Sequence, residues 1–344
     1  MVDDASEERS WRRAGVSVAY RAENGLRDVL ARAARRAGWT PAVLPYSGYG
    51  GPERARVLAR VVLAPAGTDP AARRGIPGWQ RLLTLECPGA AVDVEVGGVR
   101  ESASSDAAGL VDVVLETALG PGTTKASVCV QGRDPVPANV HVAGPTAGVG
   151  LVCDIDDTVW ITGLSHPFRA AWRTMRGTSS TRQTVPGMSQ LLRRAVQGQD
   201  HAAVIYLSNG PWNLAGPVLQ FLERHEFPTG ALLMTDWGIT PRRWFRDGRA
   251  HKAGALERLA EDLPWVRWVL VGDDGEHDPA IYEEFTRAHP ARVAAIALRQ
   301  VLPPPSSRQE SDRVGEVPVV RGPDGEAMLA RLDEVLGRSA ADQA

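Results

Sequence analysis

The chain has 344 residues and a mass of 36.9 kDa, is 43% apolar and 23% charged, and is long enough to form two domains with sizeable cores. Lysine and arginine number 39 against 41 aspartates and glutamates, so the net charge of −2 gives no general basic field for nucleic acid or an anionic membrane. Three widely spaced cysteines indicate neither a disulfide framework nor a CxxC metal site, and the lack of any long apolar run predicts neither a signal peptide nor a membrane span, so we expect a cytoplasmic protein.

Residues 1–145 are predicted to form an N-terminal helix and a β-rich accessory domain. Apolar residues recur at helical spacing from Leu26 to Ala33, and Gly38 is expected to end that helix. From about residue 56 to 142 apolar and polar residues alternate, and Gly97-Gly98 predicts a hairpin. About seven short strands indicate a small β-sandwich. The segment 48–51 (GYGG) is not expected to be a dinucleotide loop, because no strand is predicted before it and no helix after it.

Residues 146–300 follow a different pattern, in which continuous apolar strands alternate with helices. This alternation predicts an α/β domain with a parallel sheet, and such sheets place their chemistry at the carboxyl ends of the strands. The predicted strands are 149–155, 202–207, 231–234, 268–271 and 293–298, and the predicted helices lie near 188–196, 214–224, 252–263 and 279–288. Residues 301–344 are predicted to be a C-terminal loop and a short helix at about 326–336.

An acidic cluster follows the first strand of this α/β domain. Aspartates stand at positions 154, 156 and 157, directly after an apolar run. Crowded carboxylates are costly unless a cation neutralises them or one of them holds a proton, so the cluster predicts a divalent metal and acid/base chemistry. An acidic turn that caps a helix is the alternative. An EF-hand loop is excluded, because its sixth position would be Val159 and its twelfth Ser165.

Three later positions add suitable groups in order along the chain. Ser208 and Asn209 follow the second strand at an expected helix start, which favours a phosphate, although simple N-capping is the alternative. Lys252 is expected to open a later helix, and a lone lysine is more often a solvated charge. A second acidic cluster, at 273–278, follows the fourth strand. Two acidic clusters with a serine and a lysine between them are hard to explain as four independent helix caps, so a shared site is the better interpretation.

This order of DxDxT, serine, lysine and a GD-led acidic motif resembles the haloacid dehalogenase superfamily of phosphotransferases. The strings at 154–158, 208–212, 235–238 and 272–279 are similar to the catalytic domain of the phosphatidate phosphatase family of the yeast actin-patch protein, a relative of lipins. The resemblance covers about residues 145–300 and implies a Rossmann-like parallel sheet with a small cap insertion. The β-rich N-terminal part is similar to the domain that precedes this unit in bacterial members. Asp274 departs from the small hydroxyl residue expected there, which makes the metal site more acidic.

The resemblance also implies the roles of individual residues. Asp154 would be the nucleophile that forms an aspartyl-phosphate, and Asp156 would protonate the leaving alkoxide and then activate water. Mg²⁺ would lie between Asp154, the backbone carbonyl of Asp156 and Asp273, with Asp278 or Asp274 close by. The residues that would hold the phosphate or anchor its loop are Thr158, Ser208, Asn209 and Lys252.

The insertion between the first two motifs could form an entry lip of aromatic and cationic side chains. The candidates are Trp160, Trp172, Met175, Arg176 and Arg182. Such a lip suits a phosphate on an apolar body, and packing of a cap helix is an equally good interpretation. The basic stretch from Arg242 to Lys252 could steer an anionic head group or form a solvated loop.

Three functions are consistent with these motifs. We expect a Mg²⁺-dependent phosphatidate phosphatase, an enzyme of lipid metabolism that converts phosphatidate to diacylglycerol and phosphate, contacts the membrane surface transiently and has no nucleic-acid partner. The same hydrolysis of a soluble phosphomonoester is the alternative, which the lack of a predicted membrane anchor keeps open. The third is a non-catalytic phospholipid-binding module; Asp156 argues against it, because lipin-like domains that lack this second carboxylate bind lipid without turnover.

Overall fold

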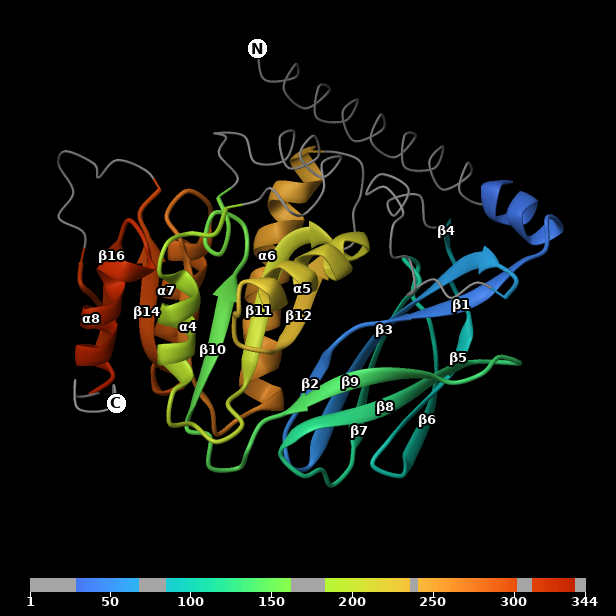
Figure 1. Cartoon of the computed structure of the whole chain (residues 1–344), viewed down its shortest axis with the longest axis horizontal. Helices are drawn as coiled ribbons and strands as arrows, with labels where there is room; N and C mark the ends of the chain where they lie inside the picture. The colour runs from blue at the N-terminus through green and yellow to red at the C-terminus, as the bar shows by residue number, and fades with distance from the viewer. Residues whose placement is uncertain (1–28, 68–84, 162–182, 236–240, 302–310, 338–344) are drawn as a thin grey trace, which may run out of the picture.

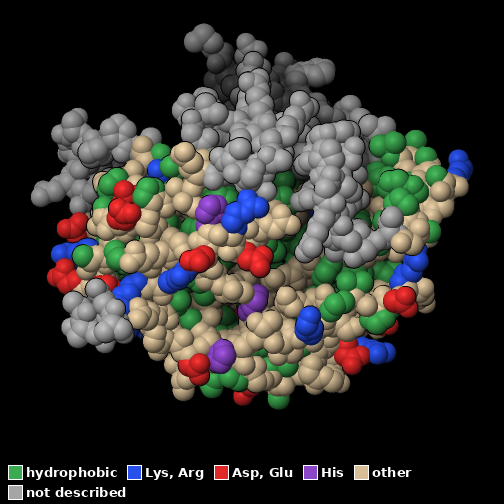
Figure 2. Space-filling view, in the orientation of Figure 1, with side chains coloured by type: hydrophobic (Ala, Val, Ile, Leu, Met, Phe, Trp, Pro, Cys, Tyr) green, Lys and Arg blue, Asp and Glu red, His purple; other side chains and the backbone are tan. Residues whose placement is uncertain are grey.

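The computed structural model describes residues 29–67, 85–161, 183–235, 241–301 and 311–337, apart from the side chains of residues 241–247. Two sheets organise this part of the chain, and they lie beside each other (Figure 1). Acidic and basic side chains are interspersed on the face shown in Figure 2, in keeping with the small net charge. Within the described ranges, no helix has the length and apolar character that a membrane span requires.

The first sheet, called here the β1–β9 sheet, is mostly antiparallel. Its strands are β1 (Trp39–Pro45), β2 (Gly48–Gly50), β3 (Arg54–Pro65), β4 (Leu85–Glu86), β5 (Ala91–Val96), β6 (Val99–Ser104), β7 (Leu110–Glu116), β8 (Gly122–Val130) and β9 (Val136–Val142). The long strand β3 pairs with β1 and β2 along one edge and with β7 and β4 along the other. Inward side chains of β3, β5, β7, β8 and β9 share one buried cluster. The nine strands therefore form one sheet curled around its own core, where we expected the two sheets of a sandwich.

Local signals explain the parts of this region that the sequence predicts. Residues 29–36 are helical and Gly38 follows with φ +83°, a backbone conformation that glycine adopts without steric cost. The expected hairpin is confirmed as β5 and β6, with Gly97 and Gly98 both at positive φ. The segment 48–51 includes strand β2, and β1 precedes it, contrary to expectation. It opens no helix, so it is still no dinucleotide loop.

The second sheet, called the β10–β16 sheet, is parallel except at one edge. Its strands are β10 (Val149–Asp154), β11 (Val204–Pro211), β12 (Ala231–Thr235), β13 (Arg267–Asp273), β14 (Val293–Arg299), β15 (Arg313–Val314) and β16 (Val317–Gly322), in the order β12-β11-β10-β13-β14-β16-β15. The first five are the predicted strands, and their almost fully buried residues explain the continuous apolar runs. Strand β16 pairs in parallel with β14, so the sheet continues beyond residue 300.

Helices cover both faces of the β10–β16 sheet. They are α4 (Met188–Val196), α5 (Ala215–Arg224), α6 (Pro241–Asp262), α7 (Asp278–Ala288) and α8 (Gly325–Val335). Helices α4 and α8 pack together on one face and α6 and α7 on the other (Figure 1). Because α6 begins at Pro241, Lys252 lies in the middle of a helix, and the expectation that it opens one is wrong. Of the two alternatives for the basic stretch, the loop is excluded as well.

The two sheets are joined by a packed interface. The ring of Tyr46 stacks on Trp212, with centroids 4.4 Å apart. At the end of α6, the carboxylate of Asp262 accepts hydrogen bonds from Tyr49 Oη (2.8 Å) and Arg56 Nε (2.9 Å). A Cβ at Gly51 would lie 2.2 Å from the ring of Trp265, so this position has room only for glycine. The β1–β9 sheet thereby holds the C-terminal end of the helix that carries Lys252.

Candidate active site

The candidate catalytic side chains meet at the carboxyl edge of the β10–β16 sheet. Asp154 is the last residue of β10, Asp273 is the last residue of β13, and Asp278 begins α7. Strands β10 and β13 are hydrogen-bonded neighbours, so their ends deliver two carboxylates to one place. Lys252 approaches from α6. The residues come from distant parts of the sequence, and the parallel arrangement brings them together.

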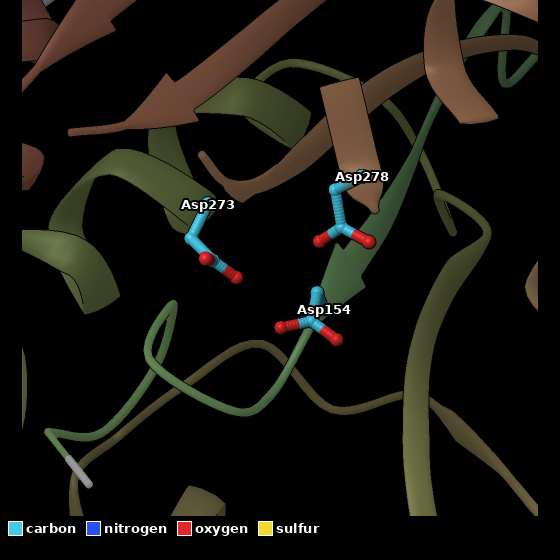
Figure 3. A group of neighbouring side chains, drawn as sticks. All are labelled: Asp154, Asp273 and Asp278. Carbon is cyan, nitrogen blue, oxygen red and sulfur yellow. The ribbon is translucent and has the colours of Figure 1, made fainter. Parts of the chain in front are cut away.

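Three buried carboxylates form the centre of the site. One oxygen from each of Asp154, Asp273 and Asp278 lies within 4.8 Å of the others, and the three side chains point toward one another (Figure 3). They are 2%, 1% and 0% exposed, respectively. Lys252, equally buried, places its Nζ 2.6 Å from Asp154 Oδ1 and 2.5 Å from Asp278 Oδ1. One ammonium faces three carboxylates, which leaves a formal charge of −2 when all are ionised.

The electrostatics of this group favour a further cation. Burial raises the pKa of Asp154 well above its usual range, and it raises the pKa of Asp273 to about 8 with help from the Asp278 carboxylate. Burial also works against the charge of Lys252, but Asp154 and Asp278 outweigh it and raise the pKa of the ammonium. Without a cation, this site therefore holds protons that exposed carboxylates would lose near neutral pH.

The donor set fits a divalent metal ion. Asp273 Oδ2 and Asp278 Oδ2 are buried and accept no hydrogen bond from any described residue. An unsatisfied buried carboxylate oxygen is costly, and a hard divalent cation satisfies such oxygens directly. Three carboxylates from two strand ends and one helix start can surround one ion. This arrangement supports metal dependence without specifying which ion binds.

The loop after β10 has a defined conformation. Thr158 Oγ1 donates a hydrogen bond of 3.1 Å to Asp154 Oδ2, which agrees with its expected role in anchoring the loop. Asp157 adopts a positive φ of 53°, and the guanidinium of Arg299 donates to its carbonyl oxygen. Arg299 also donates through Nε to the carbonyl of Pro323, 3.1 Å away. The end of β14 and the segment after β16 thus hold this loop in place.

Asp156 lies apart from the carboxylate group. Its Oδ1 accepts a hydrogen bond from Trp160 Nε1 (3.1 Å) and its Oδ2 accepts one from Ser208 Oγ (3.3 Å). Trp160 is 6% exposed and packs edge-on against Phe221, so for this residue the packing interpretation holds and the entry lip does not. It supports Asp156 from inside the domain. The other proposed lip residues, Trp172, Met175, Arg176 and Arg182, lie outside the described residues.

The second acidic cluster divides into residues with different surroundings. Asp274 Oδ1 accepts a hydrogen bond of 2.6 Å from the backbone N–H of Val301, so this carboxylate faces the end of β14 and is not grouped with the other three. Asp278 is grouped with them. Glu276, which the sequence analysis did not assign, is largely buried, and burial raises its pKa to about 7. The sequence signal that could have identified Glu276 is its position inside the 272–279 motif.

Ser208 and Asn209 lie within β11 and not at a helix start: a 3-10 turn begins at Trp212, and the predicted helix near 214–224 is confirmed as α5 from Ala215. The pairing of β11 with β12 shifts register between Leu207 and Pro211, which leaves room for local turns. Gly210 N–H donates to Ser208 Oγ at 3.0 Å. Asn209 lies between Glu276, whose Oε2 is 3.5 Å from Asn209 Nδ2, and Gly248 of α6. Both residues thus border the side of the site next to Asp156.

This part of the chain is an α/β domain, and its parallel sheet carries buried carboxylates and a lysine at the carboxyl edge. Residues 149–300 match the family described as the catalytic domain of phosphatidate phosphatase APP1.

Two curated relatives match the same part of the chain. An uncharacterised protein of Schizosaccharomyces pombe is 28% identical over 156 residues, and phosphatidate phosphatase APP1 of Saccharomyces cerevisiae is 26% identical over 153 residues. The matches cover 45% and 44% of this chain but only 26% of each relative, so the chain shares about a quarter of their length.

Solved structures are only distantly similar. A Pnkp1/Rnl/Hen1 complex aligns with a TM-score of 0.31 and 17% identity over 50% of this chain and 55% of that chain. A carbohydrate acetylesterase from Xanthomonas citri aligns with a TM-score of 0.30 and 12% identity over 86% and 74%. At these scores neither structure carries an argument about fold or activity.

Proposed function

We propose that this chain is a Mg²⁺-dependent phosphatidate phosphatase of the haloacid dehalogenase type, which hydrolyses phosphatidate to diacylglycerol and phosphate. The observation that carries the proposal is the buried group of Asp154, Asp278 and Lys252 inside a segment that matches the phosphatidate phosphatase catalytic family. The unsatisfied oxygens of Asp273 and Asp278 support a hard cation such as Mg²⁺ as cofactor. When bound, the ion supplies positive charge that screens the carboxylates from the approaching phosphate.

Asp154 is proposed as the nucleophile. Its Oδ1 is held by Lys252 and its Oδ2 by Thr158, which fixes the carboxylate at the end of β10. One of its oxygens forms a bond to phosphorus while the bond from phosphorus to the ester oxygen breaks, giving an aspartyl-phosphate and an alkoxide. The ammonium of Lys252 remains beside the transferred group and stabilises its negative charge.

Asp156 is proposed as the general acid and base. In the first step its carboxyl proton passes to the leaving alkoxide, and in the second its carboxylate takes a proton from the attacking water as the bond between phosphorus and the aspartyl oxygen breaks. Trp160 and Ser208 each donate to one of its oxygens, which fixes the carboxylate beside the phosphate position. Asn209 and Ser208 are proposed to contact the phosphoryl oxygens.

The domain assignment and location are part of the same proposal. Residues 146–300 are proposed as the core of the catalytic domain, which β15, β16 and α8 of the C-terminal segment 301–344 complete, and residues 1–145 are proposed as an accessory domain. Because the family is named for a phospholipid substrate, we propose a cytoplasmic protein that contacts membrane surfaces transiently. The small net charge implies that this contact is weak and sensitive to salt.

Phosphate release from phosphatidate in mixed micelles, measured beside a panel of water-soluble phosphomonoesters, tests the substrate assignment. We expect a much higher kcat/KM for phosphatidate than for glycerol 3-phosphate, because binding energy from the acyl region can be used at the reacting centre. Equal efficiency on the two would support the soluble-substrate alternative. Binding of phosphatidate vesicles without phosphate release would support a lipid-binding module.

A further inference from the structure

A cavity of about 330 Å³ lies between the β1–β9 sheet and the β10–β16 sheet. Residues of β2, β3 and β7 line one side, and residues of β12, α6 and the turn after β11 line the other. Its volume is in the range of small-molecule sites, which often lie at the junction of two packed units. None of the grouped carboxylates lines it, so this inter-sheet cavity is separate from the candidate active site.

Among the described residues that line the inter-sheet cavity, one cation has no counter-ion in the described part of the chain. Arg258, half-buried on α6, makes neither a hydrogen bond nor an ion pair with any residue in the described ranges. Arg56 on the opposite wall is different, because it contacts Asp112 Oδ1 at 2.7 Å and Asp262 Oδ2 at 2.9 Å. Asp112, the carboxylate that lines the cavity, is therefore already paired. Among the described lining residues, the uncompensated charge is positive and comes from Arg258.

A buried imidazole nitrogen in the same cavity also has no partner among the described residues. His251 Nε2 is buried and forms no hydrogen bond within the described part of the chain. A hydrogen bond to the backbone of Leu233 holds the ring, and burial lowers the pKa of His251 to about 4. The ring is therefore neutral near pH 7, and Nε2 is a hydrogen-bond acceptor. It matches a ligand group that carries an O–H or N–H.

The remaining lining is largely apolar. Trp212, Leu58 and Met234 contribute apolar surface to the same cavity. Tyr46 stacks on the Trp212 ring, so an aromatic or aliphatic group of a ligand would pack on the part of the indole that lines the cavity. The cavity thus offers a guanidinium that can bind an anion, a hydrogen-bond acceptor and an apolar wall. A ligand that matches these three features has one anionic end and an apolar body.

We propose that the inter-sheet cavity binds a small organic oxyanion, whose carboxylate or phosphate pairs with Arg258, whose O–H or N–H donates to His251 Nε2, and whose apolar part packs on Trp212. This site is independent of the proposed catalytic function. A ligand there would contact both sheets at once, and it would touch α6 one residue away from Lys252.

Titration calorimetry on the chelator-treated full chain tests the proposal with three probes: 4-hydroxybenzoate, 4-hydroxyphenylphosphonate and benzylamine. We expect at least one anion to bind and benzylamine not to bind. The relative affinity of the two anions then tells whether the natural ligand is a carboxylate or a phosphate. No binding of either anion, or equal binding of benzylamine, would overturn the proposal.

Two variants place the bound probe. Arg258→Gln should weaken anion binding at least about tenfold, because it removes a charge-assisted hydrogen bond. Arg249→Gln, on the same helix but exposed and paired with Glu284, is the matched control and should bind as the unaltered chain does. His251→Asn should weaken 4-hydroxybenzoate more than benzoate. Unchanged affinity in Arg258→Gln, with an unchanged melting temperature, would show that the anion binds elsewhere and would contradict the proposal.

Discussion

The ammonium of Lys252 lies 2.6 Å from Oδ1 of Asp154, and both groups are almost completely buried. This contact joins the middle of α6 to the last residue of β10 and places a positive charge beside the proposed nucleophile. The same contact offsets the cost of burying the Asp154 carboxylate, because the ammonium takes the place of water beside it.

Asp154→Asn should lower phosphatase turnover by at least about 10³-fold, because the amide has nearly the same volume but is not a nucleophile and binds metal poorly. Asp274→Asn is the matched control: its carboxylate faces Val301, so most activity should survive. Phosphate release and circular dichroism measure activity and fold. Turnover of Asp154→Asn above a tenth of the unaltered rate would remove this residue from the nucleophile role.

Asp156→Asn should lower kcat by about 10² to 10⁴-fold, the usual contribution of a general acid. Because Asp154 would still be present, covalent phosphate trapped on this variant by rapid quenching with radiolabelled substrate would support the two-step scheme. Trp160→Phe, which removes one donor to Asp156, should lower kcat more modestly and equally on phosphatidate and on a chromogenic phosphate. An unchanged rate in Asp156→Asn would refute its role.

Mg²⁺ should raise the melting temperature of chelator-treated protein, since ligand that binds only the folded state adds about 2.7 kcal/mol at a hundredfold excess over Kd. Asp273→Asn should reduce this shift strongly, whereas Asp274→Asn should change it little. Differential scanning fluorimetry gives the result without any assay of activity. A full shift in Asp273→Asn would place the ion elsewhere.

His251 should make the protein less stable in acid. Its pKa is lowered to about 4 in the folded state, against a usual value of 6.5, so the unfolded chain binds the proton first as the pH falls. Its contribution is complete above pH 6.5 and is lost between 6.5 and 4, by at most about 3 kcal/mol. Urea unfolding at several pH values should show a smaller loss for His251→Asn, while His201→Asn, which alters an exposed ring, should follow the unaltered protein.

Asp262→Ala should lower the free energy of unfolding by about 3 kcal/mol, because Arg56 and Tyr49 lose their shared buried acceptor. Asp112→Ala also removes a partner of Arg56, but its side chain is 36% exposed, and a loss of about 0.5 kcal/mol is expected. Equal losses in the two variants would mean that the contact between the sheets contributes no more than a surface ion pair.

The sequence predicts correctly the strands whose residues are uniformly buried. It does not predict the elements whose conformation depends on neighbours that are distant in the sequence. Strands β10 to β14 are visible as apolar runs because helices cover both of their faces. By contrast, the start of α6 at Pro241 is hidden by a basic stretch that resembles a loop. The short strand β16 has no such long run, and it exists because β14 offers it an edge.

The candidate site shows the same division. The order of the motifs predicts the two clusters, and the parallel sheet brings Asp154, Asp273 and Asp278 together. No spacing rule distinguishes Asp278 from Asp274, because the choice depends on where β13 ends and α7 begins. The buried position of Trp160 likewise depends on Phe221, a distant neighbour that the sequence pattern does not indicate.

The bond network of Arg299 has a consequence for how this protein can be divided. The segment that matches the catalytic family ends at residue 300, yet Arg299 joins the carbonyl of Pro323 to the loop that follows Asp154. A chain cut at residue 300 would leave β14 as an unprotected edge and would release that loop on one side. Expression trials of the catalytic unit should therefore end after α8, because the boundary of sequence similarity is not the boundary of folding.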